Sequence, residues 1–88
     1  MRRHKIATKI FQRNLETLLN TIGTNLQALR TNRNESLRTV ATAVKMSPSR
    51  LSKIEKGLCP HCRILTLIAL TKYYKVKMGD IVVKKSNS

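Results

Sequence analysis

The chain has 88 residues, and its 18 lysines and arginines so outnumber four acidic residues that the formal net charge is +14. This length supports one domain with a modest core, and the basic excess calls for a polyanionic partner, first nucleic acid and second an acidic membrane. No apolar run approaches the roughly 20 residues that span a bilayer, and the N-terminus lacks the apolar segment of a secretory signal, so we expect a cytoplasmic protein without a membrane partner.

Residues 1–21 form a basic N-terminal extension whose apolar residues recur at helical spacing. The spacing is carried by Ile6, Ile10, Leu15, Leu18 and Leu19. Two arrangements stay open: an extra helix packed on the domain, or a helix continuous with the one that follows. The cationic residues of this segment carry charge without a geometry for reading bases, so we expect them to add affinity for a polyanion but no sequence preference.

The domain itself is expected over residues 22–83, where short helical patterns alternate with turn signals. Ile22, Leu26 and Leu29 begin a first core helix, which the polar run "RTNRNE" ends near residues 31–33. Ser36 can then cap a new helix by accepting from its free amides. One face of this second helix is apolar, formed by Leu37, Val40, Ala41 and Val44.

A third helix is predicted to start directly after a short interruption. Ser47 is placed as its N-cap and Pro48 at its first position, where the missing amide of proline costs nothing. Its apolar seam is narrow, because only Leu51 and Ile54 are apolar and the remaining positions are polar or basic. Gly57 follows as a residue suited to the left-handed conformation that ends helices.

The fourth helix is predicted to form the floor of the core, with a final short turn after it. Its broad apolar face is formed by Ile64, Leu67, Ile68, Leu70, Thr71 and Tyr74. Val76, Met78 and Ile81 continue inward on the final turn. Residues 84–88, "KKSNS", are polar and basic, and we expect a disordered tail.

Two helices joined by a few residues, the second with a narrow seam and a broad basic face, are typical of a helix-turn-helix. Such a helix can enter the major groove because it buries only one edge in its own protein. Residues 22–82 resemble the Cro/CI-type, phage-repressor-like helix-turn-helix family, most specifically in "SLRTVATAVKMSPSRLSKIEKG". Ala41 stands at the family's small residue, and Ile54 to Gly57 match its Ile-Glu-basic-Gly signature. The resemblance implies an all-α, five-helix, lambda-repressor-like DNA-binding domain with an N-terminal helical extension.

The resemblance also implies which side chains contact DNA. Carried over by position, Pro48, Ser49 and Lys53 face base edges, and Lys53 is the best candidate for reading guanine through O6 and N7. Arg50 and Lys56 are assigned to phosphates. Because Pro48 and Ser49 read bases less well than Gln or Asn, we expect specificity to depend also on DNA shape and on the basic arms.

An ion pair between Arg30 and Glu55 is implied as well, since family members commonly hold a first-helix arginine against the glutamate that ends the recognition helix. In a chain with four acids, one that lies on the otherwise basic DNA-facing helix is expected to have a structural role. Loss of one partner from a fully buried pair costs about 3–5 kcal/mol.

The chain departs from the family pattern at three places. Leu37 replaces the Gln that often anchors a phosphate, so backbone amides behind Ser36 or Arg38 would have to bind that phosphate. Glu35 precedes the second-helix cap where an apolar residue is usual. The Pro and capping residue that normally precede the fourth helix are displaced, which gives "LCPHCR".

Cys59 and Cys62 have the Cys-x-x-Cys spacing of half a zinc site or of a redox dithiol. Tetrahedral zinc needs two more ligands, for which the chain offers only His61 and the distant His4, and the βαβ setting of an oxidoreductase is missing. We therefore expect two thiols in the turn before the fourth helix, without metal or cofactor, and a redox or metal switch on DNA binding as the alternative.

The function predicted from these observations is that of a small DNA-binding transcriptional regulator, a repressor rather than an enzyme, since no Ser/His/acid set or carboxylate pair is present. One alternative is an antitoxin-like protein that binds a partner protein and regulates its own gene through the same domain. Another is an RNA or membrane-surface binder, although the scarcity of aromatic residues argues against stacking on RNA bases.

We also predict a homodimer on DNA, because one recognition helix makes too few contacts to distinguish its site within a genome. The pairing surface should be apolar and lie outside the third helix. Two segments satisfy this condition: the C-terminal segment from Met78 to Val83, which the apolar run "IVV" favours, and the N-terminal helix with Phe11 and Leu15.

Overall fold

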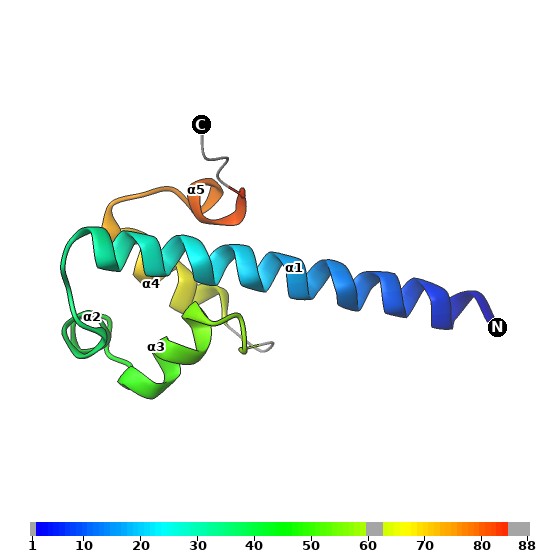
Figure 1. The fold of residues 1–88 in the computed structure, drawn as a ribbon, viewed down its shortest axis with the longest axis horizontal. Coiled ribbons are helices and arrows are strands. Elements are labelled where there is room, and N and C mark those ends of the chain that lie inside the picture. The colour runs from blue at the N-terminus through cyan, green and yellow to red at the C-terminus, as the bar shows by residue number, and fades with distance from the viewer. Residues whose placement is uncertain (1, 60–62, 85–88) are drawn as a thin grey trace.

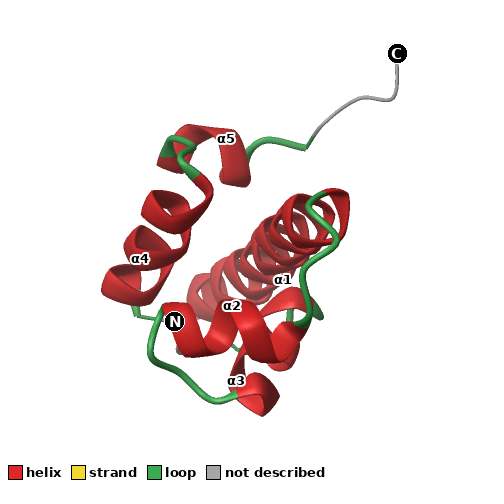
Figure 2. Ribbon diagram, turned by 90° about the vertical axis from the view of Figure 1, so that its left-hand side faces the viewer, coloured by secondary structure: helices red, strands yellow, loops and turns green. Residues whose placement is uncertain are grey.

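The protein is all-helical, as expected, in a computed structural model that describes residues 2–59 and 63–84, with side chains from residue 13 onward. No strand occurs within these ranges. The helices are α1 (Arg2–Asn32), α2 (Leu37–Ala43), α3 (Pro48–Glu55), α4 (Ile64–Tyr74) and α5 (Met78–Val82). Figures 1 and 2 show α2 to α5 gathered around the C-terminal half of α1, while its N-terminal half extends beyond them.

The N-terminal extension and the first core helix are one continuous helix, α1, of 31 residues. Of the two arrangements left open by the sequence, the continuous helix is therefore the one formed, and the expected boundary between residues 21 and 22 falls inside it. Gly23 lies in this helix next to the end of α3, since a Cβ at this position would be 2.5 Å from the Ile54 carbonyl oxygen. Glycine is required here by the close approach of two backbones. Although α1 is long, no described helix is apolar enough over a sufficient length to cross a membrane.

The predicted caps of α2 and α3 are confirmed. The Ser36 hydroxyl accepts from the Thr39 amide at 3.0 Å, and the Ser47 hydroxyl accepts from the Arg50 amide at 3.1 Å. Pro48 occupies the first turn of α3. Gly57 has a φ of 72°, the left-handed conformation expected of the residue that follows this helix. These caps separate α2 from α3 by a turn of four residues, Val44 to Ser47.

The core lies between the C-terminal half of α1 and the four shorter helices. Its fully buried residues have no exposed side-chain surface: Leu26, Val40, Ala41, Leu51, Leu70 and Ile81. The predicted inner face of α4 is confirmed at Leu67 and Tyr74, but Ile64 is 59% exposed. The expectation for Ile64 was wrong: it is the first residue of α4, and its neighbour Leu65 is 73% exposed as well, so the helix begins outside the core.

Asn25 joins the C-terminal segment to α1 by hydrogen bonds. It is a buried polar residue that the sequence pattern did not single out. Its Nδ2 donates to the carbonyl oxygens of Ile81 at 2.8 Å and Val83 at 3.0 Å. Ile81 thereby completes the core from the other end of the chain, as predicted for the final turn. Residues 85–88 of the expected disordered tail lie outside the described residues.

Candidate DNA-binding surface

Helix α3 divides into a buried seam and an exposed polar face. Leu51 has no exposed surface and Ile54 is 3% exposed, so these two residues attach the helix to the core as predicted. The outward positions are all exposed: Pro48, Ser49, Arg50, Lys53 and Lys56, the residue that ends the helix. Because only one edge of α3 packs on the core, the rest of its surface is free to enter the major groove of DNA.

The N-terminal end of α2 exposes two further polar residues, Ser36 and Arg38. Ser36 also shares a hydrogen bond of 2.9 Å with the hydroxyl of Thr39. Leu37, which replaces the family's Gln, packs against the core and is only partly exposed. It therefore contributes to packing and leaves Ser36, Arg38 and Thr39 as the polar surface of the first turn.

Arg30 and Glu55 form a bidentate pair that joins α1 to the last residue of α3. Arg30 Nε lies 2.8 Å from Glu55 Oε2, and Nη2 lies 2.9 Å from Oε1. The side chains are 13% and 4% exposed, respectively. The hydrogen bond to Glu55 raises the pKa of Arg30 above its ordinary value, more than burial lowers it. Because the pair is directional and largely buried, it fixes where α3 ends relative to α1.

Arg30 also orients the loop before α2, where the sequence departs from the family pattern. Its Nη1 donates to the backbone carbonyl of Glu35 at 3.0 Å. The carboxylate of Glu35 accepts a hydrogen bond from the hydroxyl of Tyr73 on α4. This bond is the main cause of the raised pKa of Tyr73, with burial second. Glu35 thus anchors the loop to α4, a role that the usual apolar residue would fill by packing.

Tyr73 and Tyr74 complete the group of side chains around Glu35, and no pattern in the sequence indicated this group. The rings of Tyr73 and Tyr74 meet edge to face, with centroids 5.1 Å apart. The guanidinium of Arg33 lies 5.6 Å from the Tyr73 centroid and 5.4 Å from that of Tyr74, which is the distance of cation–π contacts. Burial raises the pKa of Tyr74 to about 12. Arg33 and the two tyrosines are about 40 positions apart along the chain, so no short sequence motif reveals their contact.

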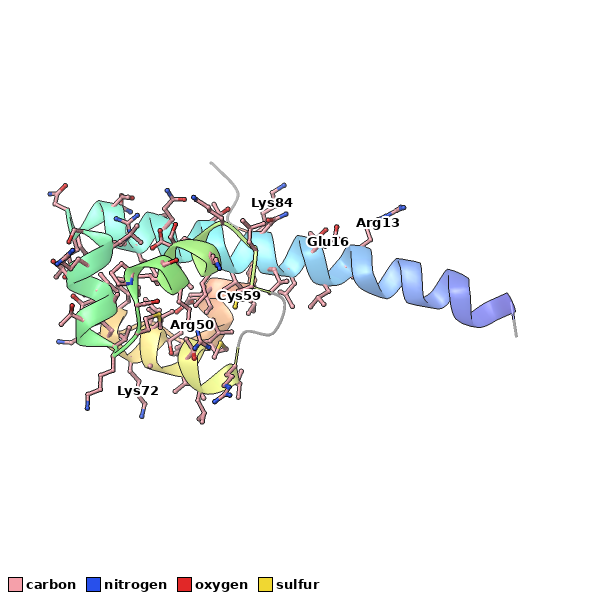
Figure 3. All side chains as sticks on the ribbon, turned by 90° about the horizontal axis from the view of Figure 1, so that it is seen from below. Arg13, Glu16, Arg50, Cys59, Lys72 and Lys84 are labelled. Carbon is pink, nitrogen blue, oxygen red and sulfur yellow. The ribbon has the colours of Figure 1, made fainter. Side chains whose placement is uncertain are left out.

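The basic surface continues from α3 to the start of α4. A groove of about 240 Å³ lies between the α2–α3 turn and α4, and three cationic residues line it: Lys45, Arg50 and Arg63. Figure 3 shows Arg50 beside α4. The lining contains no acidic residue. Arg50 was assigned to phosphate from the sequence, whereas Lys45 and Arg63 were missed because they belong to separate loops.

Cys59 is a free, half-buried thiol on the connection between α3 and α4. Its prospective partner Cys62, together with His61, falls outside the described residues, as does the side chain of His4. Within the part of the chain that the structure describes, no three metal-ligating side chains cluster. The redox or metal switch therefore stays a hypothesis.

Comparison with known families defines the class of protein that this fold and surface represent. A family model described as a helix-turn-helix domain matches residues 21–80, well over half of the chain. The chain belongs to this helix-turn-helix family, in agreement with its resemblance to the Cro/CI type, and such domains are those of DNA-binding regulators. No curated protein and no solved structure matches the chain.

Proposed function

We propose that this protein is a transcriptional regulator that binds specific duplex DNA through α3. The observation that carries the proposal is the division of α3 into a buried seam and an exposed face of small, polar and basic side chains. The net charge of +14 supports it, because a polyanion relieves the self-repulsion of so basic a chain. The Arg30–Glu55 pair supports it too, since a helix that reads bases must be held in a fixed position.

The proposed contacts follow the exposed positions. Pro48, Ser49 and Lys53 are assigned to base edges, with Lys53 donating to guanine O6 and N7. Arg50 and Lys56, at the two ends of α3, are assigned to phosphates. At the α2 end, the phosphate contact is assigned to the exposed Ser36 and Arg38 and the backbone amides there.

We propose repression as the regulatory outcome, because a domain seated in the major groove excludes other proteins from that DNA by occupancy alone. We also propose that two copies bind together. Two recognition helices related by a two-fold axis read half-sites about one helical turn, roughly 34 Å, apart. The cytoplasmic location expected from the sequence stays a prediction.

Selection of bound duplexes from a random pool tests the function directly. The expected result is a consensus composed of an inverted repeat, with guanine at a fixed position in each half. Recovery of duplexes without any common sequence would contradict specific recognition, and a consensus without a repeat would contradict the paired mode of binding.

A further inference from the structure

The first turn of α2, to which we assign a phosphate contact, is attached to the domain by few apolar contacts. The buried residues of this seven-residue helix are Val40 and Ala41, both after its first three residues. Among those three, Arg38 is exposed and Leu37 is only partly buried. Figure 1 shows the helix at the edge of the molecule, after the loop that leaves α1. The position of its N-terminal end therefore depends strongly on that loop, residues 33–36.

Glu35, the residue before the cap of α2, is bonded to the domain through both its backbone and its carboxylate. Its amide donates to the Arg30 carbonyl oxygen at 3.2 Å, and its carbonyl oxygen accepts from Arg30 Nη1 at 3.0 Å. Its Oε2 accepts from the hydroxyl of Tyr73. The backbone bonds join the loop to α1, and the carboxylate bond joins it to α4. Two helices therefore fix the point from which α2 starts.

Arg33 balances the charge of Glu35 in this loop. Its Nη1 lies 3.7 Å from Oε1 of Glu35, and the same nitrogen donates to the Tyr73 carbonyl oxygen at 3.5 Å. Its guanidinium also lies within cation–π distance of both tyrosine rings. A carboxylate next to a phosphate-binding helix end would repel the phosphate. The pairing with Arg33 weakens that repulsion, so Glu35 can hold the loop at a small electrostatic cost to DNA binding.

The bond between Glu35 and Tyr73 is directional, which apolar packing at this point would not be. Apolar side chains pack favourably in many orientations, whereas a hydrogen bond to an ionised acceptor requires a set geometry and is about twice as strong as a neutral one. The donor itself is fixed, because the next residue, Tyr74, is 4% exposed and its ring meets that of Tyr73. The bond also raises the pKa of Tyr73 above its ordinary value, as expected of a hydroxyl that donates to a carboxylate.

We propose that Glu35 and Tyr73 are positioning residues for DNA binding: their bond holds the N-terminal end of α2 where it contacts a phosphate. The pair acts through Ser36, Arg38 and the backbone amides of that end, and neither member is assigned a contact with DNA. The inference rests on the proposed function. Because phosphate contacts carry no sequence information, loss of the bond should weaken binding to all duplexes alike and leave the consensus unchanged.

Amide hydrogen exchange of the free protein tests the effect of the bond on α2 without DNA. Tyr73→Phe removes the hydroxyl and no charge. Exchange of the Val40 amide, which donates to the Ser36 carbonyl oxygen at 3.2 Å, should become about tenfold faster. The Leu51 amide makes the corresponding bond at the start of α3, to the Ser47 carbonyl oxygen at 3.1 Å, and should keep its rate. A general loss of stability would change both rates and would contradict a positioning role.

Tyr74→Phe is the matched control for this measurement. It removes a hydroxyl from the neighbouring residue, and that hydroxyl makes no hydrogen bond within the described residues. The exchange of Val40 in this variant should equal that of the wild type. Equal rates for Val40 in Tyr73→Phe and Tyr74→Phe would overturn the proposal.

DNA binding by two variants of Glu35 tests the functional part. Glu35→Gln and Glu35→Ala remove the same negative charge, so both change the general attraction to DNA equally, but the glutamine retains an oxygen that can accept from Tyr73. Glu35→Ala should therefore bind selected and random duplexes at least about tenfold more weakly than Glu35→Gln. Its slope of log affinity against log salt concentration should be smaller by about 0.9, the value of one phosphate contact.

Two results would overturn the proposal and leave DNA recognition standing: equal affinities and slopes for the two Glu35 variants, or a loss confined to the selected duplex. A wild-type protein without affinity for duplex DNA would instead overturn the proposed function itself. Circular dichroism melting shows whether each variant is folded at the assay temperature. If Glu35→Ala is not, Tyr73→Phe against Tyr74→Phe gives the same comparison of affinity and slope, because each removes one hydroxyl and no charge.

Discussion

Replacing Glu55 with alanine should lower the free energy of unfolding by about 3 kcal/mol, the lower end of the range for a broken buried ion pair. The lower end applies because Arg30, 13% exposed, retains its bond to the Glu35 carbonyl after the change. For a domain of this size such a loss lowers the melting temperature by roughly 12–24 °C, at about 4–8 °C per kcal/mol.

The assay is thermal melting followed by circular dichroism, with Glu16→Ala as the matched control. That variant removes the same charge from an exposed position on α1, where surface substitutions usually change stability by less than about 0.5 kcal/mol. If Glu55→Ala and Glu16→Ala melt at the same temperature, the pair does not stabilise the fold and the reasoning is wrong. A double-mutant cycle with Arg30→Ala then separates the coupling from the cost of each truncation.

Three further results are expected. Gly23→Ala should lower the free energy of unfolding, measured by urea denaturation, by roughly 1–3 kcal/mol, because its Cβ would meet the backbone of α3. The control Gly79→Ala, which has open space around it, should be neutral or slightly stabilising. Equal effects of the two substitutions would contradict the close approach of α1 and α3. The double variant Lys9→Gln, Arg13→Gln should reduce the slope of log affinity for DNA against log salt concentration by up to about 1.8, at 0.9 per phosphate contact. The consensus sequence should stay the same. An altered consensus would mean that this segment reads a groove. Finally, the folded-state pKa of Tyr74 is raised from 10.0 to about 12 by burial, so its contribution to stability is complete below pH 10 and disappears as the pH rises through about 12. Tyrosinate absorbance of Tyr73→Phe, in which Tyr74 is the remaining tyrosine, should show this; titration at the ordinary value would refute its burial.

The parts of the fold that the sequence predicted correctly have local signals. Ser36 and Ser47 each bond an amide three residues ahead, and Gly57 is required by its own φ, so a window of a few residues is enough to recognise them. The seam of α3 is equally local, because Leu51 and Ile54 lie within one turn. The Arg30–Glu55 contact joins positions 25 apart and could be anticipated only through the family resemblance.

The contacts that the sequence did not reveal join residues that are distant along the chain. Asn25 holds backbone carbonyls 56 and 58 positions away, and Tyr73 reaches a carboxylate 38 positions before it. Neither contact leaves a periodic pattern, since each depends on how helices cross. The sequence alone also does not decide whether α1 is continuous. Gly23 lowers helix propensity at the domain boundary, and the close approach of α3 explains why a glycine stands there.

The central claim, that α3 reads DNA sequence, is tested most directly by the affinity of Lys53→Ala for the selected site and for random duplex at the same salt concentration. Lys53 is exposed on α3 and makes no side-chain hydrogen bond within the described residues, so its removal should leave the fold intact. We expect a loss of about 1–3 kcal/mol on the selected site and little change on random DNA. An equal loss on both duplexes would show that Lys53 contacts only phosphate and would contradict base reading at this position.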